Sequence, residues 1–169
     1  MRGFAHSDED DDYYEPASRY AAGELCPITL CFSLGPGSPP RHRIIAKLGW
    51  GGFSTVWLAH DHVATRNVAL KFLEADALAT SKEAEMLQCF RVLDAGEHRV
   101  IELLDAFDHP SSNGVHRVLV SEPVLKFDLR RTSDYIPTSG RNAIRQMMAG
   151  VAFIHGRGLV YGGTYPSTS

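Results

Sequence analysis

Five short stretches of the chain are rich in apolar and β-branched residues, and turn-forming residues separate them. The alternation is clearest in the second stretch, where Val56 and Leu58 fall on one face of an extended chain and Trp57 on the other. Such segments predict β-strands. The predicted strands are residues 43–48, 53–59, 66–73, 100–107 and 115–120. Together they predict a five-stranded antiparallel sheet.

Two turns punctuate this predicted sheet. In the first strand Ile44, Ala46 and Leu48 recur at every second position, so we expect them to share one side. Residues 49–52 then hold three glycines, which predicts a tight turn into the second strand. The polar cluster at residues 108–114 predicts the turn between the last two strands.

Two longer segments have helical spacing. Residues 77–94 contain neither Gly nor Pro, and Glu83, Leu87 and Phe90 share one side of a helix because they are four and seven residues apart. We therefore expect Glu83 to point inward. A second helix is predicted over residues 140–155, with the apolar stripe Ile144, Met147, Met148, Val151 and Ile154. A sheet accompanied by these helices predicts an α+β fold.

The chain begins with an acidic run. Residues 8–12 read Asp-Glu-Asp-Asp-Asp, and their mutual repulsion opposes local folding. We expect residues 1–14 to form a disordered, solvated tail, with docking to a basic partner as the alternative. Residues 15–40 are rich in Gly, Pro and Ser and predict a linker or an irregular extension. The expected domain divisions are residues 1–40, 41–122 and 123–169.

Charge and cysteine content exclude several classes of function. The net charge is -3, which gives no general attraction to nucleic acid or to anionic membrane. The start is acidic, unlike a signal peptide, and no apolar run approaches the roughly 20 residues of a membrane span. The three cysteines are scattered without a CxxC pair, which indicates a reducing compartment. We therefore expect a cytoplasmic or nuclear protein that binds neither nucleic acid nor membrane.

One short cluster could be mistaken for a metal site. His60, Asp61 and His62 are consecutive, but they fall where the chain must turn before the next predicted strand. We expect no metal ligation there.

The glycine turn and a lysine one strand later form the candidate site. Lys71 is set among apolar neighbours, where an ammonium group needs an anionic partner, and Glu83 can supply that charge. Backbone N–H groups of a glycine turn suit an oligophosphate, and a lysine can contact two phosphates as a point charge. Leu48, Val56 and Ala69 provide an apolar slot for a flat base. The combination predicts a nucleotide site.

Two other interpretations of these residues exist. Lys71 and Glu83 could form a purely structural ion pair. Gly49, Gly51 and Ser54 resemble the dinucleotide-binding fingerprint, but its third position is serine and a strand follows where that fold needs a helix. A dinucleotide fold is therefore disfavoured.

In order and spacing, these residues resemble the eukaryotic protein kinases, whose glycine loop, Val-Ala-x-Lys strand and helix glutamate follow one another in this way. Residues 47–59, Lys-Leu-Gly-Trp-Gly-Gly-Phe-Ser-Thr-Val-Trp-Leu-Ala, are more narrowly similar to SR-protein kinases, particularly fungal members. Residues 20–30 are loosely similar to the extension that those kinases carry before the first strand. The resemblance implies a protein-kinase-like N-terminal lobe at residues 41–122, followed by a hinge and the start of the large lobe.

The resemblance also implies a ligand and a reaction. The ligand would be ATP, with Lys71 on the α- and β-phosphates and Glu83 paired to it, and the reaction would be phosphoryl transfer to protein Ser or Thr. Ser121 stands at the gatekeeper position of the hinge, and the backbones of Glu122 and Val124 would face adenine. The cofactor-binding residues that it implies are Leu48, Gly49, Trp50, Gly51, Gly52, Phe53, Ser54, Thr55, Val56, Ala69, Lys71, Glu83, Glu122 and Val124.

The catalytic loop departs from the family pattern. Gly163 stands where the family has the aspartate that accepts the substrate proton, and Thr168 stands where it has the magnesium-binding asparagine. Glycine has no side chain and a threonine hydroxyl is a poorer metal ligand. The sequence stops at Ser169, before the family's metal-binding Asp-Phe-Gly segment. We therefore expect a truncated, pseudokinase-like chain with no intact catalytic residue and no Mg²⁺ ligands.

Such a chain has two further interpretations. It could be a non-catalytic module that binds a protein partner through the exposed stripe of the second helix, or a degenerate fragment. The protein substrates that the resemblance implies are Arg/Ser-rich, but it does not identify one for this chain.

Overall fold

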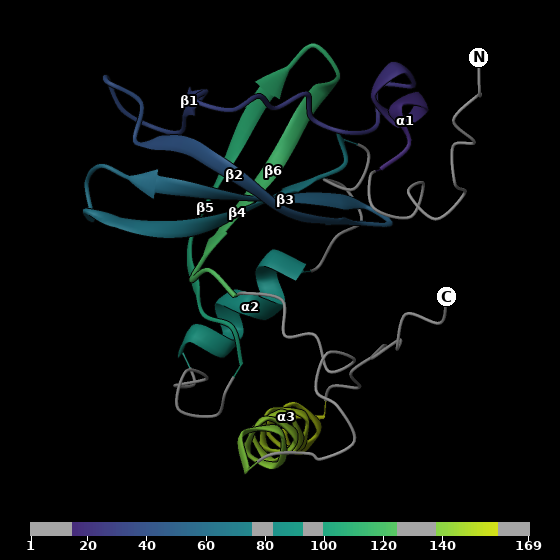
Figure 1. Cartoon of the computed structure of the whole chain (residues 1–169), viewed down its shortest axis with the longest axis vertical. Helices are drawn as coiled ribbons and strands as arrows, with labels where there is room; N and C mark the ends of the chain where they lie inside the picture. The colour runs from purple at the N-terminus through teal and green to yellow at the C-terminus, as the bar shows by residue number, and fades with distance from the viewer. Residues whose placement is uncertain (1–14, 76–82, 93–99, 125–137, 159–169) are drawn as a thin grey trace, which may run out of the picture. The chain divides into compact units, whose positions relative to one another are not determined.

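The computed structural model describes residues 15–75, 83–92, 100–124 and 138–158. Its contacts divide the chain into two compact units (Figure 1). The first unit reaches Ala84 and takes in Leu103–Val124, and the second consists of Glu85–Glu102 and Leu125–Ser169. The acidic run at residues 8–12 lies outside the described residues.

The first unit contains one six-stranded sheet in the order β1-β2-β3-β4-β6-β5, and every neighbouring pair is antiparallel. The five predicted strands are present, and the α+β prediction is confirmed. The additional strand, β1, is too short to show an alternating pattern in the sequence. The strands are β1 (Ser33–Leu34), β2 (His42–Gly51), β3 (Ser54–Asp61), β4 (Arg66–Leu73), β5 (Leu103–Ser111) and β6 (Gly114–Ser121).

Strand β5 differs from its predicted form. It begins later than expected and runs through most of the segment predicted as a turn, including Pro110. Proline has no N–H to donate, but β5 lies at the edge of the sheet, where one side of the strand needs no ladder bonds. Ser111 pairs with Gly114, so the turn is confined to two residues.

The two faces of the sheet are buried differently. In β3 the buried Trp57 and Ala59 alternate with the half-buried Val56 and Leu58, which confirms the predicted opposition of these side chains. One core cluster covers the Trp57 face. It consists of Cys26, Ile28, Leu34, Ile44, Trp57, Ala59, Val68, Leu70, Phe72, Val118 and Val120.

The prediction for the first strand was wrong in one respect. Ile44 pairs with Ala59 on the core face, whereas Ala46 pairs with Leu58 on the opposite face. A β-bulge between Ile44 and Ala46 shifts the register by one residue, and each such shift reverses the face of the residues that follow.

Residues 15–40 pack against the sheet. Leu25, Cys26 and Leu34 are almost completely buried, and the segment includes helix α1 (Ala17–Ala21) as well as β1. Its apolar side chains have no regular spacing, so the composition left a linker and an irregular extension open, and the structure favours the extension. The backbone of Ile44 makes two hydrogen bonds to this segment. Its C=O accepts from Cys31 N–H at 3.0 Å, and its N–H donates to Phe32 C=O at 2.8 Å.

A polar cluster lies at the far end of the β2–β3 pair. The Arg41 guanidinium donates to both carboxylate oxygens of buried Asp61 at 2.7–3.0 Å and to Asp105 at 2.9 Å. Asp61 Oδ1 also accepts the backbone N–H groups of Val63 and Ala64. Burial by itself raises the pKa of Asp61, but the hydrogen bonds from Arg41, Ala64 and Val63 outweigh it and hold that pKa well below its ordinary value.

His42 is buried beside this cluster. Its ring stacks on Phe107 with centroids 5.5 Å apart, and Nε2 lies 3.7 Å from Asp61 Oδ2. Among the described residues, neither ring nitrogen has a hydrogen-bond partner. Gly35, whose φ is +98°, packs directly against the His42 ring. A Cβ at this position would lie only 2.6 Å from His42 Nδ1, so a larger residue would collide with the ring. Burial lowers the pKa of His42, and the opposing attraction of Asp61 only partly offsets this. His42 is therefore held neutral.

Helices α2 and α3 agree with the two predicted helices. Helix α2 (Glu83–Val92) lies within the predicted residues 77–94, and the remainder of that range is outside the described residues. Helix α3 (Thr138–Gly156) matches the predicted second helix. In the second unit, Ile154 of α3 is buried with Leu87, Val100 and Phe153 around it. Within the described part of the chain, no helix combines the length and apolarity needed to cross a bilayer.

Because His42 is neutral in the folded protein, part of the free energy of unfolding should depend on pH. Because its pKa is lower in the folded state, the unfolded chain binds more protons as the pH falls below about 6.5, and stability is lost there. We expect His42→Phe, which can keep the stacking on Phe107, to lose less stability than the wild type between pH 7.5 and 5.5. Urea unfolding at both pH values measures this difference. Equal losses in the two proteins would contradict the prediction.

Candidate nucleotide site

The glycine turn is a tight hairpin between β2 and β3. Gly51 pairs with Ser54, so Gly52 and Phe53 form a two-residue loop. A Cβ at Gly52 would meet nothing within 4 Å, and one at Gly51 would meet only Ser54 Oγ at 3.9 Å. Neither glycine has a left-handed φ. Neither backbone angles nor packing against the described residues require glycine at these two positions. The effect of glycine there is to leave the backbone open to approach from outside.

Side chains of the hairpin divide into exposed and buried groups. Phe53 at the tip is 74% exposed, and Trp50 is at the border of exposed. Ser54 and Thr55 are buried, and the Thr55 hydroxyl accepts a hydrogen bond from Trp57 Nε1 at 3.2 Å. Of these predicted site residues, Ser54 and Thr55 can therefore offer a ligand little more than their backbones.

Register brings the remaining predicted residues to one face of the sheet. Val56 pairs with both Gly49 and Lys71, and Ala69 pairs with Leu58 and Ser121. This face is opposite the core cluster. The bulge between Lys47 and Gly49 is what turns Gly49 to the Val56 face. Leu48 lies at this bulge and is half-buried. Leu58, which was not among the predicted site residues, also belongs to this face. Its alternation with Trp57 in the sequence could have identified it.

Lys71 and Glu83 meet as expected. Lys71 Nζ lies 2.6 Å from Glu83 Oε1, and the pair joins β4 to the start of α2 within the first unit. Glu83 points toward Lys71, and the two side chains remain 33% and 37% exposed. An ion pair of this exposure contributes at most about 1 kcal/mol to stability. The pair therefore orients the ammonium group more than it stabilises the fold.

The segment after β6 lies beside this face. Ser121 donates its hydroxyl to Glu122 C=O at 3.2 Å, and Glu122 and Val124 are exposed. Because Ser121 pairs with Ala69, the segment leaves the sheet next to the predicted slot. Gly163 and Thr168 lie outside the described residues, so the structure does not place them.

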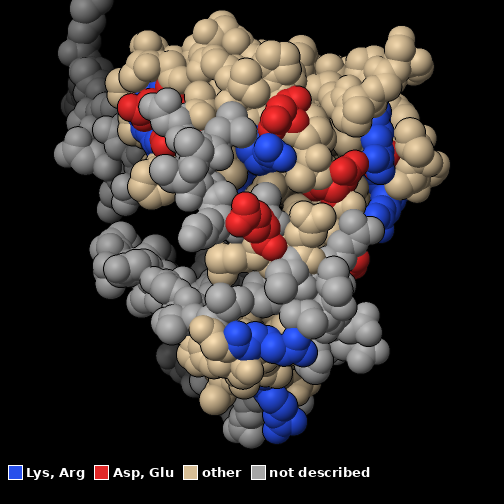
Figure 2. Space-filling view, turned by 180° about the vertical axis from the view of Figure 1, so that it is seen from behind, with Lys and Arg blue, Asp and Glu red and all other residues tan. Residues whose placement is uncertain are grey.

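Among the described residues, no three or more His, Cys, Asp or Glu side chains gather closely enough to hold a metal ion. The rings of His60 and His62 are 5.1 Å apart, and His60 Nδ1 contacts Asn67 at 3.2 Å. Figure 2 shows acidic and basic side chains interspersed over the face in view, without a broad area of one sign among the described residues.

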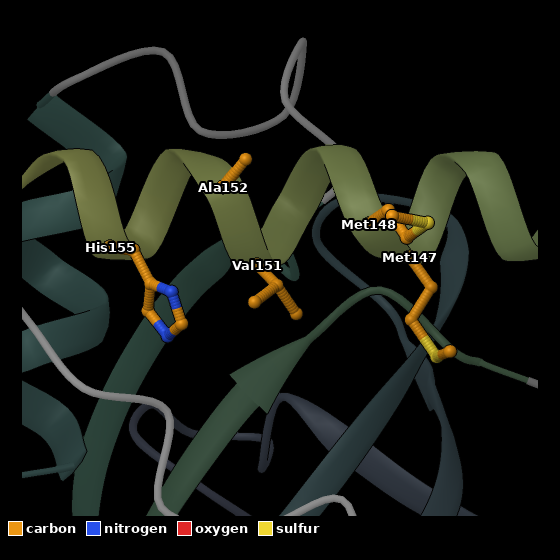
Figure 3. Close-up of a pocket in the computed structure, with 5 residues that line it drawn as sticks. All are labelled: Met147, Met148, Val151, Ala152 and His155. Atoms are coloured by element: carbon orange, nitrogen blue, oxygen red, sulfur yellow. The ribbon is translucent and has the colours of Figure 1, made fainter.

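Helix α3 carries an apolar groove of about 340 Å³ in the second unit. Met147, Val151 and His155 project from the same side of the helix (Figure 3). Met147 and Met148 are 54% and 66% exposed, whereas Ile154 is buried. The predicted stripe is thus divided: one end packs within the unit and the methionines are open.

Known proteins resemble this chain over most of its length. Residues 42–162 match the protein kinase domain. Serine/threonine-protein kinase SKY1 of Saccharomyces cerevisiae is 34% identical over 90% of this chain and 22% of its own length. Human SRSF protein kinase 3 is 30% identical over 86% of this chain and 27% of its own length. Protein kinase dsk1 of Schizosaccharomyces pombe is 43% identical over 48% of this chain and 16% of its own length.

The chain therefore belongs to the protein kinase family. Its six-stranded sheet and the Lys71–Glu83 ion pair lie within the matched residues or directly beside them. Within the family it is SR-protein-kinase-like, as the resemblance of the glycine hairpin predicted. It spans about a quarter of the length of these two relatives.

Proposed function

We propose that the first unit binds ATP on the sheet face formed by the glycine hairpin, Val56, Ala69 and Lys71. The observation that carries the proposal is the Lys71–Glu83 contact at 2.6 Å, on the face that Gly49 and Val56 share and beside a glycine backbone open to approach. The glycine backbone at residues 51 and 52 is open to approach, and the ion pair is about one-third exposed. A ligand that carries phosphates would use both.

Each part of the face has a role toward a nucleotide. Backbone N–H groups of the hairpin and the Lys71 ammonium would hold phosphate oxygens, where charge-assisted hydrogen bonds are strongest. Leu48, Val56 and Ala69 would contact the faces of the adenine ring, and the backbones of Glu122 and Val124 would meet its polar edge. Glu83 would keep Lys71 oriented while the phosphates are absent.

We infer that this chain alone does not transfer the phosphoryl group. In the family the reaction depends on metal ions that neutralise developing charge and on an aspartate that positions the hydroxyl. Gly163 and Thr168 do not fit those roles, so we assign the chain no Mg²⁺-dependent step.

A second role is favoured by the open methionines of α3. We propose that the groove around Met147, Val151 and His155 binds a protein partner, so that the chain acts as an interaction module. Apolar area of this kind on a protein surface commonly marks an interface.

A cytoplasmic or nuclear location agrees with the free thiols of Cys26 and Cys31.

ATP binding predicts a thermal shift that depends on Lys71. At a hundredfold excess over its dissociation constant, ATP should stabilise the wild type by about 2.7 kcal/mol. Lys71→Met removes charge-assisted hydrogen bonds and should weaken binding roughly tenfold or more. Arg66→Met, which removes an exposed cation from the other end of β4, is the matched control and should shift like the wild type. No shift in any of the three proteins would refute the nucleotide site.

Catalytic incompetence predicts a negative kinase assay. We expect no incorporation of phosphate into an Arg/Ser-rich peptide with Mg²⁺ and ATP, under conditions in which ATP still produces the thermal shift. Incorporation that disappears in Lys71→Met would show that the chain is an active kinase after all.

The α3 proposal predicts association through the methionines. We expect the wild type to self-associate or to precipitate at micromolar concentration, and the Met147→Glu, Met148→Glu double variant to sediment as a monomer. Arg145→Glu is the control, because it introduces the same acidic residue on the same helix but outside the groove. A wild type that is already monomeric and as soluble as the double variant would rule this out.

A further inference from the structure

We propose that residues 15–34 brace the glycine hairpin in its nucleotide-binding position, with Glu15 and Arg19 as positioning residues. The inference rests on the proposed ATP site and adds a second set of residues to it. These residues do not lie on the nucleotide face. They act through the first arm and the tip of the hairpin.

Glu15 holds the first arm. Its carboxylate pairs with Lys47 of β2, the residue just before the bulge at which Gly49 turns to the nucleotide face. Lys47 Nζ also lies 5.2 Å from the centre of the Trp57 ring, on the core side of the sheet. The Glu15 side chain is only 6% exposed, and Tyr20 donates its hydroxyl to the same oxygen that meets Lys47. A buried carboxylate shared between two donors fixes its partners closely.

The pKa of Glu15 supports a charged contact. Burial by itself raises the pKa, but the hydrogen bonds from Lys47 and Tyr20 outweigh burial and lower it below the ordinary value. Glu15 is therefore ionised at neutral pH, and Lys47 meets a full negative charge.

Arg19 holds the tip. Its guanidinium pairs with Glu74, which comes directly after β4, and its Nε donates to Glu24 at 2.8 Å. The backbone N–H of Glu74 donates to Phe53 C=O at 3.1 Å, and Phe53 is the tip of the hairpin. One chain of contacts thus runs from α1 through Glu74 to the loop that would cover the phosphates.

The brace itself is firmly attached. Asn113 Nδ2 donates to Tyr20 C=O and Leu25 C=O, each at 2.8 Å, and Ala75 N–H donates to Glu24 C=O at 3.4 Å. Leu25 and Cys26 are 1% exposed, and burial raises the pKa of Cys26 to about 11 against the opposing hydrogen bond from Ser111. Arg19 and Glu15 are therefore presented from a fixed segment rather than from a free tail.

A glycine hairpin benefits from such an attachment. Glycines leave the backbone open to phosphate but also give it more conformational freedom to lose on binding. Contacts that hold the loop before the ligand arrives reduce that loss, which raises affinity without touching the ligand. The brace supplies such contacts at the strand that enters the hairpin and at its tip.

The test compares Glu15→Gln and Arg19→Gln in the full chain with Arg117→Gln. Arg117 pairs with Asp108 at 2.8 Å in the same sheet, away from the hairpin, and is the matched control. We expect the first two variants to bind ATP roughly three- to tenfold more weakly, because the loop must then be ordered by the ligand. Arg117→Gln should bind as the wild type does, and Arg19→Lys should recover part of the loss in Arg19→Gln.

Hydrogen exchange without ATP separates bracing from general stability. We expect faster exchange at residues 48–55 in Glu15→Gln and Arg19→Gln, with unchanged exchange at Leu70 and Val118 in the core. Cys26 should remain slow to alkylate while the exposed Cys31 reacts, which shows that the segment stays docked. Unchanged exchange at residues 48–55, or equal acceleration there and in the core, would overturn the proposal. If the wild type fails to bind ATP, the nucleotide site is refuted and the exchange result still decides whether residues 15–34 brace the hairpin.

Discussion

The antiparallel register of β2, β3 and β4 is the constraint on which the candidate site depends. Pairing of Val56 with Gly49 and Lys71 places an open backbone and a cation side by side on one face. Because neighbouring residues of a strand point to opposite faces, a shift of one residue would send Lys71 toward the core cluster. Two bulges in β2 set this register, and the second brings Gly49 to the face of Val56.

Burial on the opposite face holds that register. Val68, Leu70 and Phe72 of β4 are at most 1% exposed, and each buried side chain of this size contributes about 1.5–3 kcal/mol. The opposite face, which carries Lys71, contributes less, since Lys71 and Glu83 remain about one-third exposed. The first unit thus separates the two tasks: one face supplies stability and the other stays open for ligand chemistry.

Residues 15–34 cover the buried face of the sheet and contact the residues that flank the hairpin. Their apolar side chains cover the sheet, while Glu15 and Arg19 contact Lys47 and Glu74. At the other end of the same strands, Arg41 neutralises the buried carboxylate of Asp61, which without that partner would be a costly buried charge. Polar contacts at both ends of the β2–β3 pair therefore limit how it can slide or twist.

The sequence by itself determined five of the six strands, helices α2 and α3, the glycine hairpin and the partnership of Lys71 with Glu83. These follow from local alternation, from turn chemistry and from spacing along a helix, which neighbouring residues specify. Only the tertiary structure decided that Ala46 leaves the face of Ile44, that Pro110 lies inside an edge strand and that Leu25, Cys26, Ile28 and Leu34 are buried. Each of these depends on which strand lies beside which, and the bulges and irregular apolar residues involved have no periodic signature. Pairing across the sheet, rather than pattern along the chain, thus placed Gly49, Val56 and Lys71 on one face.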